Sequence, residues 1–281
     1  KEILALAPDS DKIRFFLGAV YEEVKDYKSA MEQFQQIEPA SSYFAEAVVH
    51  STYLKKLTGD LEGAIVSIEQ AIELRPETPQ FYPLYASFLD DTQQYAKATK
   101  MLEGAVVRFP TSDQLHFFLG SMQDKLGDKT STIQSMKKTL ELNPDHVQAM
   151  NYLAYTYADM NQNLEEAYAL AKKAYELKPD DAYIQDTVGW VYFKKGQYQE
   201  AVKILEAANK LKSDESIIAE HLGDAYYQLK LFGKAKEIYK QIQAIFLDEL
   251  PVFYAWYRPF LHVVDKTKFA GYVDSAYDNG L

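Results

Sequence analysis

The sequence has no cysteine, which excludes disulfide bonds, thiolate metal sites and cysteine nucleophiles. Glycine and proline are scarce, at 12 and 10 of 281 residues, so long helices with brief interruptions are expected. No apolar run approaches the roughly 20 residues that a membrane-spanning helix needs, so we predict no transmembrane segment. Acidic residues outnumber basic ones by 41 to 30, and the net charge of −11 argues against a general nucleic-acid binder.

Motifs that carry chemistry are also missing. The five histidines lie at positions 50, 116, 146, 221 and 262, and no two have the i, i+4 spacing of a helical metal site. No phosphate-binding loop, dinucleotide fingerprint or G-x-S-x-G elbow occurs. The sequence therefore predicts a protein that is not an enzyme, with no catalytic residue, no metal site and no cofactor.

The sequence does contain an internal repeat of about 34 residues. Two columns of small residues and one column of prolines recur in register. The columns are Ala30, Ala64, Ala98, Thr132, Ala167, Ala201 and Ala235; Gly18, Thr52, Ala86, Gly120, Ala154, Gly189 and Gly223; and Pro8, Pro76, Pro110, Pro144 and Pro179. One extra residue, near Asn163, lengthens the fifth repeat, and the first repeat ends early, at Pro39. Such a period indicates an array of like units rather than a single globular core.

Each repeat is interpreted as two antiparallel helices. Small residues let the two backbones approach where the helices cross, and a proline cannot continue a helix and so ends the unit. Gly59, Gly127 and Gly196 fall between the two helices of their repeats, where a tight turn favours a residue that tolerates positive φ. These features predict an all-α fold.

The repeat resembles that of the tetratricopeptide-repeat (TPR) family. The clearest unit begins Asp186-Thr-Val-Gly-Trp-Val-Tyr and continues through Ala201, and a second begins Glu220-His-Leu-Gly-Asp. The resemblance implies a right-handed superhelical solenoid of about seven helix–turn–helix units. The last three repeats look similar to bacterial cell-envelope TPR lipoproteins that act as scaffolds or protease adaptors. That similarity favours a periplasmic or outer-membrane-anchored protein over a cytoplasmic one.

Three segments are expected along the chain. Residues 1–10 read as the end of a preceding helix, and residues 11–245 hold the seven-repeat array. Residues 246–281 form an aromatic-rich tail that is expected to cap the last repeat or to occupy the groove of the array. Self-association through residues 246–281 is a further possibility that the sequence leaves open.

In the TPR family the first helix of each repeat lines a concave face, and family geometry predicts which side chains point into it. The predicted partner-binding residues are Phe15, Tyr53, Phe117, Asn151, Tyr155, Tyr183, Asp186, Trp190, Phe193, Glu220, Asp224 and Tyr227. Rings supply most of the binding energy in many interfaces, and negative charge favours a positively charged partner. The lining therefore predicts a protein or peptide partner that is basic or apolar.

The resulting functional hypothesis is a scaffold or adaptor that binds a partner on the concave face of the array. Two alternatives remain open at this point. The chain could be the repeat region of a larger enzyme whose catalytic domain is absent, or a structural protein that assembles with copies of itself.

Overall fold

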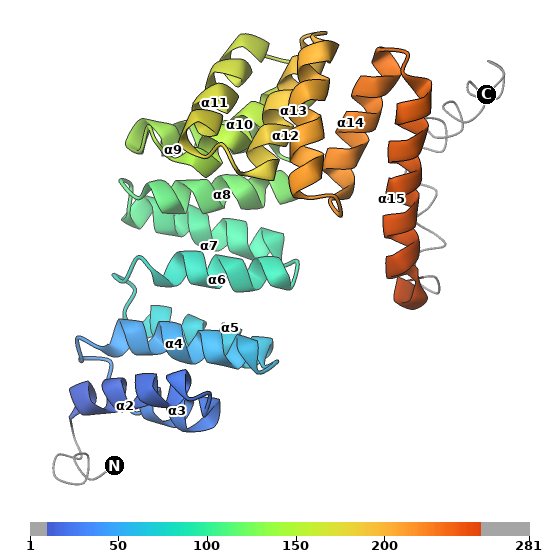
Figure 1. Cartoon of the computed structure of the whole chain (residues 1–281). Coiled ribbons are helices and arrows are strands. Elements are labelled where there is room, and N and C mark those ends of the chain that lie inside the picture. Colours follow the sequence, from blue (N-terminus) through green and yellow to red (C-terminus); the bar gives the residue numbers. More distant parts are fainter. Residues whose placement is uncertain (1–9, 254–281) are drawn as a thin grey trace. The chain divides into compact units, whose positions relative to one another are not determined.

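The computed structural model describes residues 10–253, with side chains described through Ile242. The described residues form fourteen α-helices and no strand, which confirms the predicted all-α fold (Figure 1). The helices are α2 (Asp11–Glu23), α3 (Tyr27–Phe34), α4 (Phe44–Leu57), α5 (Leu61–Leu74), α6 (Phe81–Asp91), α7 (Tyr95–Arg108), α8 (Asp113–Lys125), α9 (Lys129–Leu142), α10 (Val147–Asp159), α11 (Leu164–Leu177), α12 (Ala182–Lys194), α13 (Tyr198–Leu211), α14 (Ser216–Gln228) and α15 (Phe232–Phe253).

The chain divides into two compact blocks, which we name the N-terminal block (residues 1–146) and the C-terminal block (residues 147–281). Consecutive helices pair into repeats, four in the N-terminal block and three in the C-terminal block. We call α2, α4, α6, α8, α10, α12 and α14 the first helices, and their partners the second helices. Within each block, successive first helices pack against one another, as α4, α6 and α8 do, and as α10, α12 and α14 do.

Several helices begin at a polar residue whose side chain accepts a hydrogen bond from the first turn. Ser10 caps α2, Asp60 caps α5 and Asp181 caps α12, in each case by accepting from a backbone N–H two or three residues further on. These caps satisfy donors that the helix itself leaves free, and each is worth about 1 kcal/mol. They explain why the short turns between helices can stop one helix and start the next within a few residues.

The turn inside each repeat contains one residue with positive φ. Gly59, Gly127 and Gly196 have φ values of 89°, 80° and 73°, which confirms the predicted role of these glycines. The equivalent residues in the other four repeats are not glycine, and they are Lys25, Gln93, Asn161 and Lys230, with φ between 52° and 61°. The extra residue of the fifth repeat is accommodated by a second left-handed residue, Asn163, at φ 47°.

Replacing Gln93 with glycine is expected to stabilise the protein by about 0.5–1 kcal/mol, because a side chain strains the left-handed backbone that glycine adopts freely. Gln93 has φ 57° and is exposed, so no buried contact is lost. Urea denaturation measures the change. The matched control is Gly127→Ala in the next repeat, at φ 80°, which should destabilise by a similar amount. A loss of stability in Gln93→Gly would contradict the strain argument.

The small-residue column lies where the two helices of a repeat touch. A Cβ atom added at Gly18, Gly189 or Gly223 would come within 2.5–2.6 Å of a ring or side chain from the second helix. The residue that blocks it stands sixteen positions later in each case, and these are Phe34, Leu205 and Tyr239. The residues of this column are therefore small because the side chains that face them from the second helix are large. Together the two sets of residues fix the distance between the paired helices.

Helix lengths differ at the two ends of the array. The second helix of the first repeat, α3, has 8 residues, whereas α5, α7 and α9 have 14, which agrees with the early end of that repeat. Helix α15 runs to Phe253 and so continues past position 245, where the sequence places the end of the array. The predicted three-part division stays a prediction, since residues 1–9 and 254–281 lie outside the described residues.

Candidate functional site

The twelve predicted partner-binding residues all lie on first helices. Their exposure varies widely, which the repeat position alone does not reveal. In the N-terminal block, Phe15 belongs to the core, with its ring 5.8 Å from Phe34 and 5.3 Å from Tyr43. Tyr53 is 54% exposed on α4, and Phe117 on α8 is half-buried with its ring 4.9 Å from that of His146.

Sequence reasoning missed one apolar residue on the same helix as Tyr53. Leu57 lies one turn later on α4 and is 52% exposed. Residues four apart on a helix share a face, so Tyr53 and Leu57 form an exposed apolar pair. The i, i+4 spacing from Tyr53 was the signal that could have found it.

Four of the eight acidic side chains on the first helices of the N-terminal block lie within ion-pair distance of a basic side chain of the same block. The pairs are Glu22–His50 (2.7 Å), Lys56–Asp91 (2.6 Å), Asp90–Lys125 (3.6 Å) and Asp124–Lys129 (2.7 Å). Exposed pairs of this kind add little stability, about 0–1 kcal/mol each. The three lysine pairs cancel charge locally, so this face is less acidic than a count of carboxylates suggests.

The C-terminal block contains a buried ionisable pair between two neighbouring first helices. Asp186 of α12 is 4% exposed, and its two carboxylate oxygens lie 2.8 and 3.0 Å from Nδ1 of His221 on α14. An ionised carboxylate can only accept, so in that state Nδ1–H of His221 donates. Burial raises the pKa of Asp186, and the hydrogen bond from His221 opposes that rise.

Aromatic rings stack in series on the imidazole of His221, one member of this pair. The ring of Trp190 lies 4.0 Å from that of His221 at an interplanar angle of 14°, and Phe193 stacks on Trp190 at 4.8 Å and 8°. Tyr155 of α10 lies 6.1 Å from His221. Trp190 is itself only 8% exposed, whereas Phe193 and Tyr155 are half-buried and present ring surface to solvent. Three first helices thus contribute to one aromatic cluster.

The remaining predicted residues of the C-terminal block lie on the same three first helices as this cluster, but they make other contacts. Asn151 on α10 is half-buried, and its Oδ1 atom has no hydrogen-bond partner. Tyr183 donates to Glu215 at 2.7 Å and accepts from Lys212 at 3.0 Å.

On α14, Glu220 is exposed, and Asp224 accepts a hydrogen bond from Tyr239 at 2.6 Å. Tyr227 meets Phe232 edge-on at 5.4 Å. The structure does not test whether any of the twelve residues contacts a partner, and their role stays a prediction.

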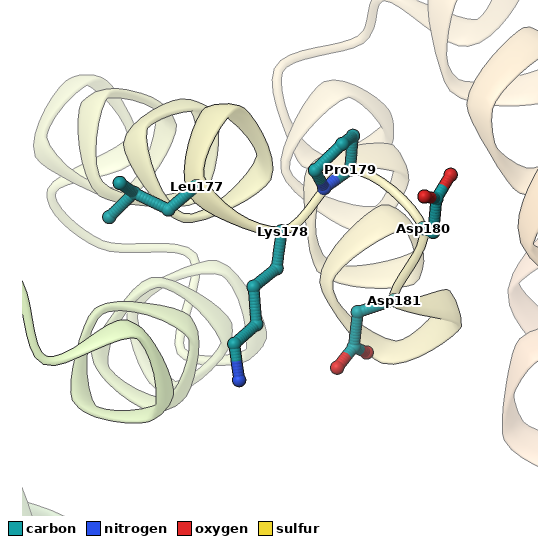
Figure 2. Close-up of a pocket in the computed structure, with 5 residues that line it drawn as sticks. All are labelled: Leu177, Lys178, Pro179, Asp180 and Asp181. Carbon is teal, nitrogen blue, oxygen red and sulfur yellow. The ribbon is translucent and has the colours of Figure 1, made fainter.

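A shallow, open hollow lies at the turn between α11 and α12. Figure 2 shows the five residues that line it, Leu177, Lys178, Pro179, Asp180 and Asp181. Asp181 already caps α12, and none of the five is a predicted partner-binding residue. We attribute the hollow to the turn itself.

No group of three potential metal ligands gathers anywhere in residues 10–253. Within the same range, no helix combines the length and the apolar character that crossing a membrane would require.

The stacked helix pairs, the small-residue column and the turns define a helical-repeat protein of the tetratricopeptide type. The chain belongs to the tetratricopeptide-repeat family. Models of the tetratricopeptide repeat match residues 52–78, 113–146 and 136–169, and a model of the anaphase-promoting complex, cyclosome, subunit 3 matches residues 160–242.

Two curated relatives illustrate the similarity. A TPR repeat-containing protein of Pseudomonas aeruginosa is 27% identical over 192 residues, which cover 68% of this chain and 32% of that protein. The mitochondrial import receptor subunit TOM70 of Rattus norvegicus is 20% identical over 191 residues, which cover 68% of this chain and 26% of that protein. The chain thus spans about a third or less of the length of these relatives.

Solved structures share the fold. A tetratricopeptide repeat protein from Parabacteroides merdae has a TM-score of 0.64 at 16% identity, covering 84% of this chain and 93% of that one. The Cut9 and Hcn1 assembly of the APC/C has a TM-score of 0.63 at 17% identity, covering 80% of this chain and 44% of the matched chain. YrrB, described as a TPR protein with an unusual peptide-binding site, has a TM-score of 0.50 at 21% identity, covering 61% and 88%.

Proposed function

We propose that this chain is a scaffold or adaptor that binds a partner protein or peptide on the first helices of its repeats. One observation carries the proposal: each block presents apolar or aromatic surface on its first helices. Tyr53 and Leu57 do so in the N-terminal block, and Tyr155 and Phe193 in the C-terminal block. Exposed rings held on rigid helices are the kind of anchors that peptide recognition uses. The peptide-binding site named for YrrB supports the same use of the fold.

The charges of the two blocks support a basic or apolar partner. In the C-terminal block, Glu220 is exposed and has no ion pair among the described residues, and Asp224 accepts from a tyrosine hydroxyl rather than from a cation. In the N-terminal block, lysine side chains pair with three carboxylates of the first helices, Asp90, Asp91 and Asp124. A basic group of the partner could therefore pair with Glu220 on α14.

A bacterial cell-envelope setting, as a lipoprotein, belongs to the same proposal. The resemblance of the last three repeats supports it, and the Pseudomonas aeruginosa relative supports only a bacterial origin. Fractionation of cells that express the full-length gene product tests it, and recovery only in the cytosol would contradict it.

A peptide probe is obtained by selecting binders of the whole chain from a random library of 12-residue peptides. Its affinity is then measured by fluorescence anisotropy. Truncating an interface anchor costs about 2 kcal/mol or more, so substitutions in the block that holds the peptide are expected to lower its affinity by about tenfold or more. The substitutions are Tyr155→Ala and Phe193→Ala in the C-terminal block, and Tyr53→Ala and Leu57→Ala in the N-terminal block. The result also shows which block holds the peptide.

The controls are exposed apolar residues on second helices. Val66 of α5 and Val107 of α7 are 45% and 81% exposed, so Val66→Ala and Val107→Ala remove similar surface from the other helix of a repeat. Both should leave the affinity unchanged. If Val107→Ala weakened the peptide while all four substitutions on the first helices were neutral, the binding site would lie on the second helices and the proposal would be wrong.

A further inference from the structure

The buried pair of Asp186 and His221 is unlike the surface ion pairs of the N-terminal block. The side chains of Lys56 and Asp91 are each more than a third exposed, whereas those of Asp186 and His221 are 6% and 4% exposed. Burying two ionisable groups removes their hydration, and well-packed apolar residues in their place are often as stable or more so. The buried pair is therefore not explained by its contribution to stability, and its location suggests a different role.

The location matters because no hydrogen bond anchors the indole of Trp190. Its indole Nε1 atom is buried and has no hydrogen-bond partner, so no hydrogen bond fixes the orientation of the ring. The orientation depends on stacking, and His221 makes the closer of its two ring contacts, at 4.0 Å. His221 is in turn held by two short contacts to the carboxylate of Asp186.

Trp190 and His221 also contact the two half-buried rings of the cluster, those of Phe193 and Tyr155. Phe193 stacks on Trp190, and Tyr155 faces His221 from α10. Both rings are half-buried, and both are surfaces that a partner could touch. Asp186 is separated from solvent, so it can influence a bound peptide only through His221 and Trp190.

We propose that Asp186 and His221 are positioning residues, which hold Trp190 and through it Phe193 in the orientation that receives an apolar side chain of the partner peptide. The inference rests on the proposed function, because it names what organises the binding surface of the C-terminal block. It also makes peptide binding at this surface dependent on pH, because the carboxyl group of Asp186 can take up a proton.

The direction of that dependence follows from the surroundings of the pair. Burial raises the pKa of Asp186, so this carboxyl group takes up a proton at a higher pH than an exposed aspartate does. The other charge acting on it is Glu215, before α14, which raises its pKa further. Tyr155 faces His221 from α10, and the ammonium of Lys194 lies 4.7 Å over the ring of Trp190. Protonation of Asp186 ends its charge-assisted bond to His221, and peptide affinity therefore falls as the pH is lowered.

The test compares wild type with Asp186→Asn, which keeps the shape of the side chain and removes its titration. Affinity for the library-selected peptide is measured by anisotropy from pH 8 to pH 4.5. Wild type is expected to lose about tenfold in affinity over this range, the equivalent of about 1.4 kcal/mol. Asp186→Asn is expected to bind about tenfold more weakly at pH 8 and to vary little with pH. Wild-type affinity and an unchanged pH profile in Asp186→Asn would overturn the inference.

A second variant separates positioning from simple stability. Asp186→Leu combined with His221→Phe removes the carboxyl group and the imidazole but keeps a ring that can stack on Trp190. We expect this double variant to bind the peptide within about threefold of wild type at pH 8 and to lose the pH dependence. Weak binding by a double variant whose circular dichroism and melting match wild type would show that the stack is not what the pair provides.

A measurement without peptide keeps the inference testable if the proposed function fails. The sequence has two tryptophans, so Trp256→Phe leaves Trp190 as the only one. The emission of a tryptophan responds to a ring stacked against it, so release of Trp190 from His221 should change its spectrum. In the Trp256→Phe background, adding Asp186→Asn should change the emission of Trp190 at pH 8 while circular dichroism stays the same. An unchanged spectrum would refute positioning, whereas a changed spectrum without any first-helix effect on peptide binding would refute only the proposed function.

Discussion

Replacing His221 with leucine is expected to lower the free energy of unfolding of the C-terminal block by about 3–5 kcal/mol at neutral pH. The reason is that a buried carboxylate left without its partner is strongly destabilising. Asp186 would keep its burial but lose the hydrogen bond and charge that His221 supplies. Urea denaturation followed by Trp190 fluorescence, in the Trp256→Phe background, reports on the block that contains the change.

The loss should depend on pH with a defined sign. Burial raises the pKa of Asp186 in the folded protein above its usual value of 3.8, and removing His221 raises it further. A raised carboxyl pKa contributes stability that is present below the unfolded value and is lost as the pH rises through the folded value. The deficit of His221→Leu relative to wild type should therefore be small near pH 4 and largest at pH 7.

The matched control is the double variant Asp186→Leu and His221→Leu. Removing both partners leaves no buried charge, and such apolar replacements are often neutral or stabilising by about 1–4 kcal/mol. The double variant is expected to recover most of the stability that His221→Leu loses, so the two changes should be strongly non-additive. Equal losses in the single and double variants, independent of pH, would contradict this account.

The second large effect concerns the contact between the two helices of the sixth repeat. Gly189→Leu is expected to destabilise the C-terminal block by about 3 kcal/mol, because it adds a side chain to a packed contact. A Cβ atom alone would lie 2.5 Å from Cγ of Leu205, and Leu205 is fully buried. The measurement is again urea denaturation monitored by Trp190.

Two variants check that crowding is the cause. Gly104 lies on the exposed face of α7, and a Cβ atom added there meets nothing within 4 Å. Gly104→Ala should therefore stabilise by about 0.5–1 kcal/mol, since alanine favours a helix over glycine. Combining Gly189→Leu with Leu205→Ala should restore part of the loss. A further loss in the combined variant, equal to the sum of the two single losses, would show that the side chains do not compete for space.

The charged contacts between neighbouring first helices could have been predicted from the repeat period. Lys56 with Asp91, and Asp186 with His221, are each separated by 35 residues, one repeat plus one. Neighbouring first helices bring such residues together, so the repeat period itself contains the signal. Residue type alone instead indicated an acidic face, because it could not tell which carboxylates meet a cation on the next helix.

Burial was harder to anticipate. Tyr53, Trp190 and Phe15 occupy predicted inward positions, yet Tyr53 is exposed and the other two are buried. The difference comes from what the adjacent helices supply. His221 places a ring against Trp190, and Phe34 and Tyr43 enclose Phe15.

The sequence by itself determined the period of about 34 residues, the all-α fold, the glycine turns and the small-residue column. Each of these follows from local conformational preference or from a contact within one repeat. Only the tertiary structure decided which first-helix side chains face solvent, and that Asp186 and His221 form a buried pair beneath Trp190. Those outcomes depend on side chains from different repeats, whose shapes and charges vary at equivalent positions although the backbone repeats.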